Sequence, residues 1–144
     1  MNIQSILRTA CATMTFAVAG AVAITLPAEA HGGAETATPN FQRAIPNIPG
    51  KSLTAVVVEY PPGAASHEHK HAPSAFIYAY VVSGDIESQV NDGPKRIYHA
   101  GESFSEEPGA VHRVSRNASA TKPAKLLAVF IADSDEKALT IPIK

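Results

Sequence analysis

The sequence has little of what would indicate a disulfide scaffold, a nucleic-acid-binding protein or a disordered chain. Its 144 residues include a single cysteine, Cys11, which excludes an intramolecular disulfide and a cysteine-based zinc site. Lys and Arg number 12 against 13 Asp and Glu, and no basic run of five occurs, so a nucleic-acid groove is not expected. Charged residues are only 17% and hydrophobic residues 45%, which argues against wholesale disorder.

Residues 1–30 have the composition of a secretory signal peptide. The stretch from Thr9 to Leu26 carries no charge, and Ala28-Glu29-Ala30 forms an A-x-A cleavage signal before His31. The alternative, a retained membrane anchor, is disfavoured because alanine and threonine dilute the apolar stretch. We therefore expect a periplasmic or secreted protein without a membrane association once the peptide is cleaved.

The rest of the chain predicts a short arm followed by one β domain. Residues 31–50 are rich in Gly, Thr, Ala and Pro and show no periodicity, which predicts an extended arm. The domain, residues 51–144, contains short β-branched and apolar runs bounded by Pro, Gly, Asn and Asp, and no ten-residue pattern of an amphipathic helix. These features predict a β-sandwich or barrel. The expected strands are Ser52–Tyr60, Ala75–Val82, Ile86–Val90, Lys95–His99, Ser103–Ser105, Val111–Ser115, Ala124–Ala132 and Ala138–Ile143.

Histidine is the residue type that points to chemistry. His67, His69 and His71 alternate along the chain, so their side chains point to one side of an extended segment. Imidazole groups that converge in this way suit zinc, copper, iron and nickel. A fourth histidine, His112, stands near the start of a later expected strand.

These residues resemble the two motifs of the cupin superfamily. The first motif, a Gly, five residues and His-x-His with a later Gly, is matched by Gly63, His69, His71 and Gly84. The second motif is matched by Gly101, Gly109 and His112, with Asn117 nearby, although Glu107 stands where this motif has its Pro. The resemblance implies a small single-domain, all-β double-stranded β-helix of the jelly-roll type. It also implies a divalent transition metal, one of Fe, Mn, Zn, Ni or Cu, held by His69, His71 and His112.

The match to the first motif departs from the family pattern at its carboxylate. The Glu of this motif should fall between Ala75 and Ile77, where the chain has Ala-Phe-Ile. The expected metal set is therefore three neutral histidines, with His67, which is out of register by motif spacing, as an alternate ligand. Glu106 and Glu107 are near His112 in the sequence, but we expect them in a solvated turn.

A metal held by three neutral ligands would keep its full charge and leave coordination positions open. Such a site favours binding an anionic ligand or polarising a carbonyl group of a small organic molecule. Because one fold hosts many activities, two classes stay open. One is a metal-dependent enzyme, such as a dioxygenase or an isomerase, and the other is a non-catalytic module that binds or senses a ligand or metal.

The expected strand Ala75–Val82 presents two different faces. Phe76, Tyr78 and Tyr80 share one face, and Ile77, Ala79 and Val81 share the other. If Ile77 occupies the place of the missing Glu, the aliphatic face lies inside the barrel and the tyrosines lie outside. Exposed tyrosines on a sheet face would then indicate a homodimer, and the alternative is that Tyr78 and Tyr80 pack against the N-terminal arm.

Overall fold

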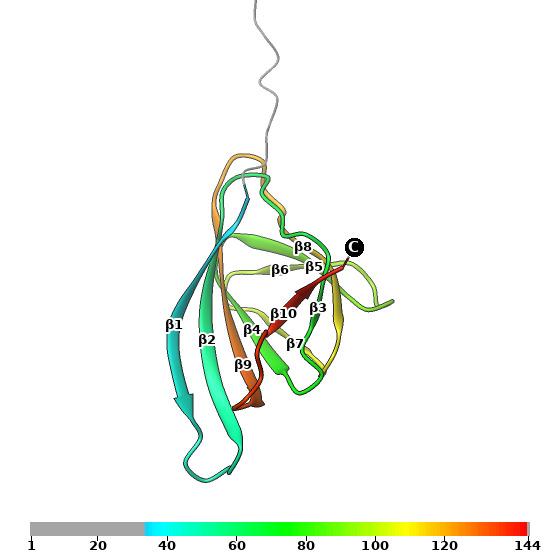
Figure 1. Cartoon of the computed structure of the whole chain (residues 1–144). Helices are drawn as coiled ribbons and strands as arrows, with labels where there is room; N and C mark the ends of the chain where they lie inside the picture. Colours follow the sequence, from blue (N-terminus) through cyan, green and yellow to red (C-terminus); the bar gives the residue numbers. More distant parts are fainter. Residues whose placement is uncertain (1–33, 144) are drawn as a thin grey trace, which may run out of the picture.

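The computed structural model describes residues 34–143, which are built from β-strands and the turns between them (Figure 1). In this range ten strands form two five-stranded antiparallel sheets. No helix in residues 34–143 is long and apolar enough to cross a membrane. The predicted signal peptide and the first residues of the arm lie outside the described residues. The all-β prediction is confirmed.

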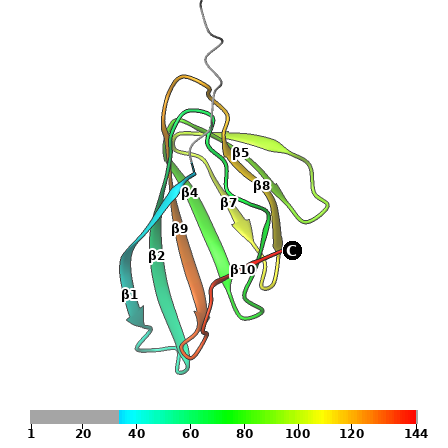
Figure 2. The same ribbon diagram turned by 45° about the horizontal axis from the view of Figure 1, so that its top comes forward.

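Each sheet combines strands from distant parts of the chain, as Figure 2 shows for β1, β2, β9 and β4. The first sheet has the order β1 (Thr36–Ala44), β2 (Lys51–Tyr60), β9 (Ala124–Asp133), β4 (Phe76–Ser83) and β7 (Ser103–Glu106). The second has the order β10 (Thr140–Pro142), β3 (His69–His71), β8 (Val111–Asn117), β5 (Asp85–Val90) and β6 (Arg96–His99). This arrangement is the jelly roll that the resemblance to the cupin superfamily implies.

The arm contains a strand that its composition did not predict. Residues 36–44 form β1, which pairs with β2 along the edge of the first sheet and has an irregularity between Pro39 and Phe41. All nine residues of β1 are exposed. Its backbone pairs with β2 although no apolar alternation marks it as a strand, which is why the pattern indicated only an extended segment.

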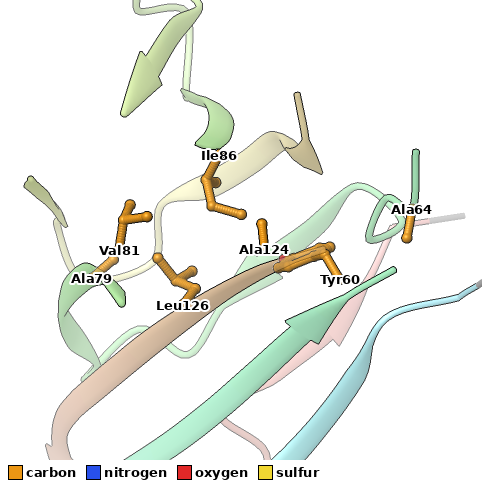
Figure 3. Close-up of a cluster of buried hydrophobic side chains, with 7 residues drawn as sticks. All are labelled: Tyr60, Ala64, Ala79, Val81, Ile86, Ala124 and Leu126. Carbon is orange, nitrogen blue, oxygen red and sulfur yellow. The ribbon is translucent and has the colours of Figure 1, made fainter. Parts of the chain in front are cut away.

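The core between the sheets forms two clusters in the described part of the chain. One consists of Tyr60, Ala64, Ala79, Val81, Ile86, Ala124 and Leu126 (Figure 3). The other consists of Ala72, Ala75, Ile77, Ala128, Phe130 and Ala132, so four of its six members are alanine. Such small side chains do not fill the space between two sheets. The interior therefore has room for a cavity beside the second cluster.

Strand β4 turns its aliphatic face inward and its aromatic face outward, as expected if Ile77 takes the place of the motif Glu. Ile77, Ala79 and Val81 are buried, whereas Phe76 and Tyr78 are 37% and 44% exposed. The period of two sends alternate side chains to opposite faces of the sheet. Ile77 therefore faces the interior, in the stretch Ala75–Ile77 where the first motif would place its carboxylate.

Candidate metal site

Three of the predicted ligands come together on two neighbouring strands. His69 and His71 lie on β3 and face the same side, and His69 is the direct partner of His112 on β8. One possible ligand atom from each of the three histidines lies within 4.8 Å of the other two. Alternation along β3 and the β3–β8 register therefore produce a cluster suited to one metal ion.

Each of these rings has a hydrogen-bond partner on one nitrogen. His69 Nδ1 lies 2.7 Å from the carbonyl oxygen of His67, and His71 Nδ1 lies 3.3 Å from that of Leu139. The Nε2 atom of His112 lies 2.9 Å from Ser88 Oγ. Outer partners of this kind orient the rings of metal-binding histidines. The nitrogens left for a metal are Nε2 of His69, Nε2 of His71 and Nδ1 of His112.

The rings lie at the boundary between the protein interior and a cavity. His71 and His112 are buried, and His69 is half-buried. Burial is the largest cause that lowers the pKa of His69 from 6.5, and the neighbouring His112 and His71 rings lower it further. A lowered pKa keeps this imidazole neutral, which is the form that binds metals.

His67, the alternate ligand, does not join the cluster. Its side chain is exposed, and it contributes its backbone carbonyl to the His69 ring. His99 lies on β6, where its exposed ring contacts Asp85 at 2.7 Å. Neither ring lines the cavity next to His69, His71 and His112.

Glu106 lies beside the histidine cluster, so the expectation that it belongs to a solvated turn is wrong. It is 3% exposed, and its Oε2 and Oε1 atoms lie 3.1 Å from His71 Nε2 and 3.2 Å from His112 Nδ1. The predicted solvated turn starts one residue later, at the exposed Glu107, because β7 continues to Glu106. Phe104 and Glu106 share the inward face of β7, and this alternation is the signal that was missed.

The electrostatics of Glu106 are dominated by the two rings. Burial raises the pKa of its carboxyl group, but the adjacent His112 and His71 rings outweigh burial and lower the pKa from 4.5 to about 2. The carboxylate is therefore ionised at neutral pH. His71 Nε2 and Glu106 Oε2, although close together, have no hydrogen-bond partner with suitable geometry among the described residues. A buried nitrogen and a buried carboxylate oxygen in this situation suit a cation that contacts both.

The cluster forms part of the wall of a cavity of about 390 Å³. Its other walls are mainly apolar, and no Lys or Arg of the described chain lines it. The residues that line the cavity in addition to the three histidines and Glu106 are Glu35, Ala37, Pro39, Val56, Val58, Tyr60, Ser66, Ile77, Ala79, Ser115, Leu126, Ala128, Phe130, Leu139 and Thr140.

A group of hydroxyls provides the cavity with a second polar region. The Tyr60 hydroxyl lies 2.9 Å from Ser66 Oγ and 2.8 Å from Ser115 Oγ, and burial raises the pKa of Tyr60 from 10.0. The three hydroxyls carry three protons, and these two hydrogen bonds use two of them. One proton is left that this group can donate to a ligand.

Two antiparallel sheets around a cavity with clustered histidines define a double-stranded β-helix protein with a candidate metal site. The profile of one family, described as the cupin domain, matches residues 56–130, which is more than half of the chain. The chain therefore belongs to the cupin family. Among curated proteins, none matches its sequence.

Solved structures resemble the fold at low sequence identity. A conserved protein with a double-stranded β-helix domain from Klebsiella pneumoniae is 21% identical, with a TM-score of 0.60 over 78% of this chain and 87% of its own. An oxalate oxidase is 20% identical, with a TM-score of 0.54 over 63% of this chain. A DMSP lyase from Ruegeria pomeroyi is 23% identical, with a TM-score of 0.51 over 62% of this chain. The chain spans 46% of the oxalate oxidase and 42% of the lyase.

Proposed function

We propose that this protein is an exported metal-binding cupin in which His69, His71 and His112 hold one divalent transition metal and the cavity takes a small organic molecule. The observation that supports it best is the convergence of three possible ligand atoms within 4.8 Å at the wall of a cavity. One nitrogen of each ring has an outer partner, so the other is available to the ion. When bound, the ion would supply Lewis-acid polarisation of a ligand oxygen.

The walls of the cavity favour a mainly apolar ligand with one or two oxygen atoms. Because no Lys or Arg of residues 34–143 lines the cavity, an anionic ligand would depend on the metal alone for charge compensation. The Tyr60 hydroxyl group can orient the far end of a ligand whose first oxygen binds the metal. An anion remains a ligand class to test, because the three-histidine pattern favoured it.

Two classes of activity fit this site. The first is a metal-dependent dioxygenase, isomerase or lyase, which the solved oxalate oxidase and DMSP lyase structures make worth testing. The second is a non-catalytic module that binds or senses a ligand or metal. Turnover of a small apolar carbonyl compound or phenol by the metal-loaded protein favours the first class, and saturable binding without turnover favours the second.

Metal content of the protein as exported tests the central proposal. The chain is expressed in full and purified from the periplasm, and its intact mass should begin at His31 as the A-x-A signal predicts. Elemental analysis should find about one transition metal per chain. H69A, H71A and H112A should each empty the site, whereas H67A should keep the metal because only its backbone carbonyl contacts His69. If all four variants keep the metal content of the native protein, the proposal is refuted.

We also propose that a second copy of the chain covers the outer face of the first sheet. Phe76 and Tyr78 of β4 are exposed there, and Tyr78 is the ladder partner of Val129 on the neighbouring β9. Phe41 on β1 extends the apolar surface across the same face, opposite Ala55. In a twofold dimer the same patch of both copies meets, so these exposed side chains of two chains would cover one another. Light scattering should give a dimer for the native chain and a monomer for Y78E.

A further inference from the structure

The missing carboxylate of the first cupin motif has a counterpart on a different strand. We propose that Glu106, on β7, is the fourth protein ligand of the metal that His69, His71 and His112 hold. This inference rests on the proposed function, since it names a further ligand of the same site. It predicts a set of three histidines and one carboxylate in which the carboxylate reaches the ion from the neighbouring strand.

The strand register places Glu106 where the motif needs an oxygen. Glu106 is the direct partner of Ile77 across the β4–β7 ladder, and both side chains line the cavity. Directly opposed residues have Cβ atoms about 4.5–5.5 Å apart. A carboxylate at either position can therefore approach the same space from adjacent strands.

The contacts of Glu106 indicate a ligand more than a group that only orients the rings. Its oxygens face His71 Nε2 and His112 Nδ1, which are the nitrogens left free by Leu139 and Ser88. Both rings already have an orienting partner on the opposite side. Glu106 thus contacts the nitrogen atoms that face the centre, as a group sharing one ion with them would.

Two further observations point to an ion at this place. His71 Nε2 and Glu106 Oε2 are both buried and lack a hydrogen-bond partner of suitable geometry in the described chain. Among the described residues, Glu35 and Glu106 are the two acidic residues that line the cavity. No Lys or Arg of this part of the chain lines it, so no cationic side chain pairs with the Glu106 carboxylate there. A divalent ion contacting Glu106 and His71 would satisfy both atoms.

A carboxylate ligand changes what the site can bind. One negative charge from Glu106 lowers the net charge of a divalent centre from +2 to +1, which weakens its attraction for anionic ligands. A set of three neutral histidines alone would leave the ion its full charge, and this was the reason to expect an anionic ligand. With Glu106 included, a neutral oxygen ligand becomes the better match for the apolar cavity.

A titration of the full-length, metal-free protein with Co²⁺ at pH 7.5 tests this inference. Visible absorption reports the coordination sphere, and calorimetry reports affinity. E106Q keeps the size of the side chain but removes its charge, and it should weaken Co²⁺ binding by about 100-fold or more and change the visible spectrum, since losing a ligand should cost at least as much as losing an outer partner. E107Q, which removes an exposed carboxylate one residue away, should leave both unchanged.

A swap across the ladder separates a ligand from a merely structural residue. I77E/E106Q carries the carboxylate on β4, as the family motif does, and should regain affinity to within about tenfold of the native protein. I77Q/E106Q has no carboxylate at either position and should not regain it. A crystal structure of the Co²⁺-loaded native protein should show a Glu106 oxygen about 2.0–2.2 Å from the ion, by analogy with zinc–carboxylate distances.

The outcomes distinguish this inference from the proposed function. If the native protein binds Co²⁺ and H71A does not, but E106Q binds with native affinity and spectrum, Glu106 is not a ligand and the three-histidine site stands. An ion held by the histidines more than 3 Å from Glu106 in the crystal would overturn the inference in the same way, whether or not E106Q folds. If the native protein binds no Co²⁺ at all, both proposals fail.

Discussion

Ile77 on β4 and Glu106 on β7 face each other across an antiparallel ladder, and both point into the cavity. The cupin motif places its carboxylate near the first position, and this chain has one at the second. The carboxylate of this chain therefore enters the same interior space from the neighbouring strand. This relationship changes what a substitution at Ile77 is expected to do.

We predict that I77E destabilises the metal-free protein. The substitution would bury a second carboxylate beside Glu106, and like charges directly opposed across a ladder repel each other. The loss should exceed about 2 kcal/mol in urea denaturation with a chelator present. I77Q, which has the same size without the charge, should lose less. Equal losses for I77E and I77Q would contradict a charge effect.

Asn117 connects two loops at the end of the barrel. Its side-chain nitrogen donates to the carbonyl oxygens of Tyr60, Pro61 and Lys122, and its Oδ1 atom accepts from the Ser119 amide. The side chain is buried. This structural role explains the presence of Asn at the end of the second motif.

We predict that N117A lowers the free energy of unfolding by about 2–3 kcal/mol, because it leaves buried polar groups without partners. Chemical denaturation measures the loss, and N40A serves as the matched control because Asn40 is exposed. Metal affinity per folded molecule should not change. A difference below about 0.5 kcal/mol between the two variants would show that other groups or water replace the Asn117 hydrogen bonds.

Gly84 and Gly63 offer a matched test of backbone strain and crowding. Both have positive φ, +72° at Gly84 and +71° at Gly63, a region that disfavours side chains. A Cβ on Gly84 would lie 2.7 Å from the Pro123 carbonyl oxygen, whereas a Cβ on Gly63 would meet nothing within 4 Å.

G63A should therefore cost about 1–2 kcal/mol of stability from the backbone alone, and G84A should cost about 1–3 kcal/mol more from the clash. Thermal and urea denaturation of the two variants, measured side by side, give the difference. If G84A is no less stable than G63A, Pro123 in the β8–β9 connection does not lie as close to Gly84 as the structure indicates.

His99 and Asp85 form an exposed ion pair outside the metal site, with Nδ1 and Oδ1 2.7 Å apart. The hydrogen bond to Asp85 is the largest cause that raises the pKa of His99 above 6.5, followed by the charge of Asp85. A raised pKa means that the pair contributes stability below pH 6.5 and loses it as the pH rises through the folded-state pKa.

An NMR titration of the His99 ring should therefore find a pKa above 6.5 in the native protein. D85N should bring it back toward 6.5, and E102Q should lower it less because Glu102 contributes only a weaker charge effect. Added salt should reduce the shift in the native protein, since the pair is exposed. An unchanged pKa in D85N would rule out the ion pair in solution.

Local patterns were sufficient to predict eight of the ten strands in the described residues and part of the site, whereas β1 and β3 were expected only as extended segments. Apolar runs between Pro, Gly and Asn turns predict strands such as β4, β8 and β9, because each strand forms from neighbours in the chain. The period of two places His69 and His71 on one side of β3, and the structure confirms that orientation. The motif spacing added His112 from a distant segment. The error at Glu106 was also local, because the expected strand ended at Ser105, one residue before the end of β7, and this put Glu106 in the following turn.

The sequence by itself determined the fold class, the inward face of β4 once Ile77 took the motif position, and the histidines of the cluster. Only the tertiary structure decided that β1 pairs with β2, that His67 contributes its backbone instead of its ring, and that Glu106 lies opposite Ile77 between two histidine rings. The physical reason is that alternation and turn chemistry act between near neighbours in the chain. The register between β4 and β7, by contrast, is set by the packing of the whole barrel, and this register brings the carboxylate to the site.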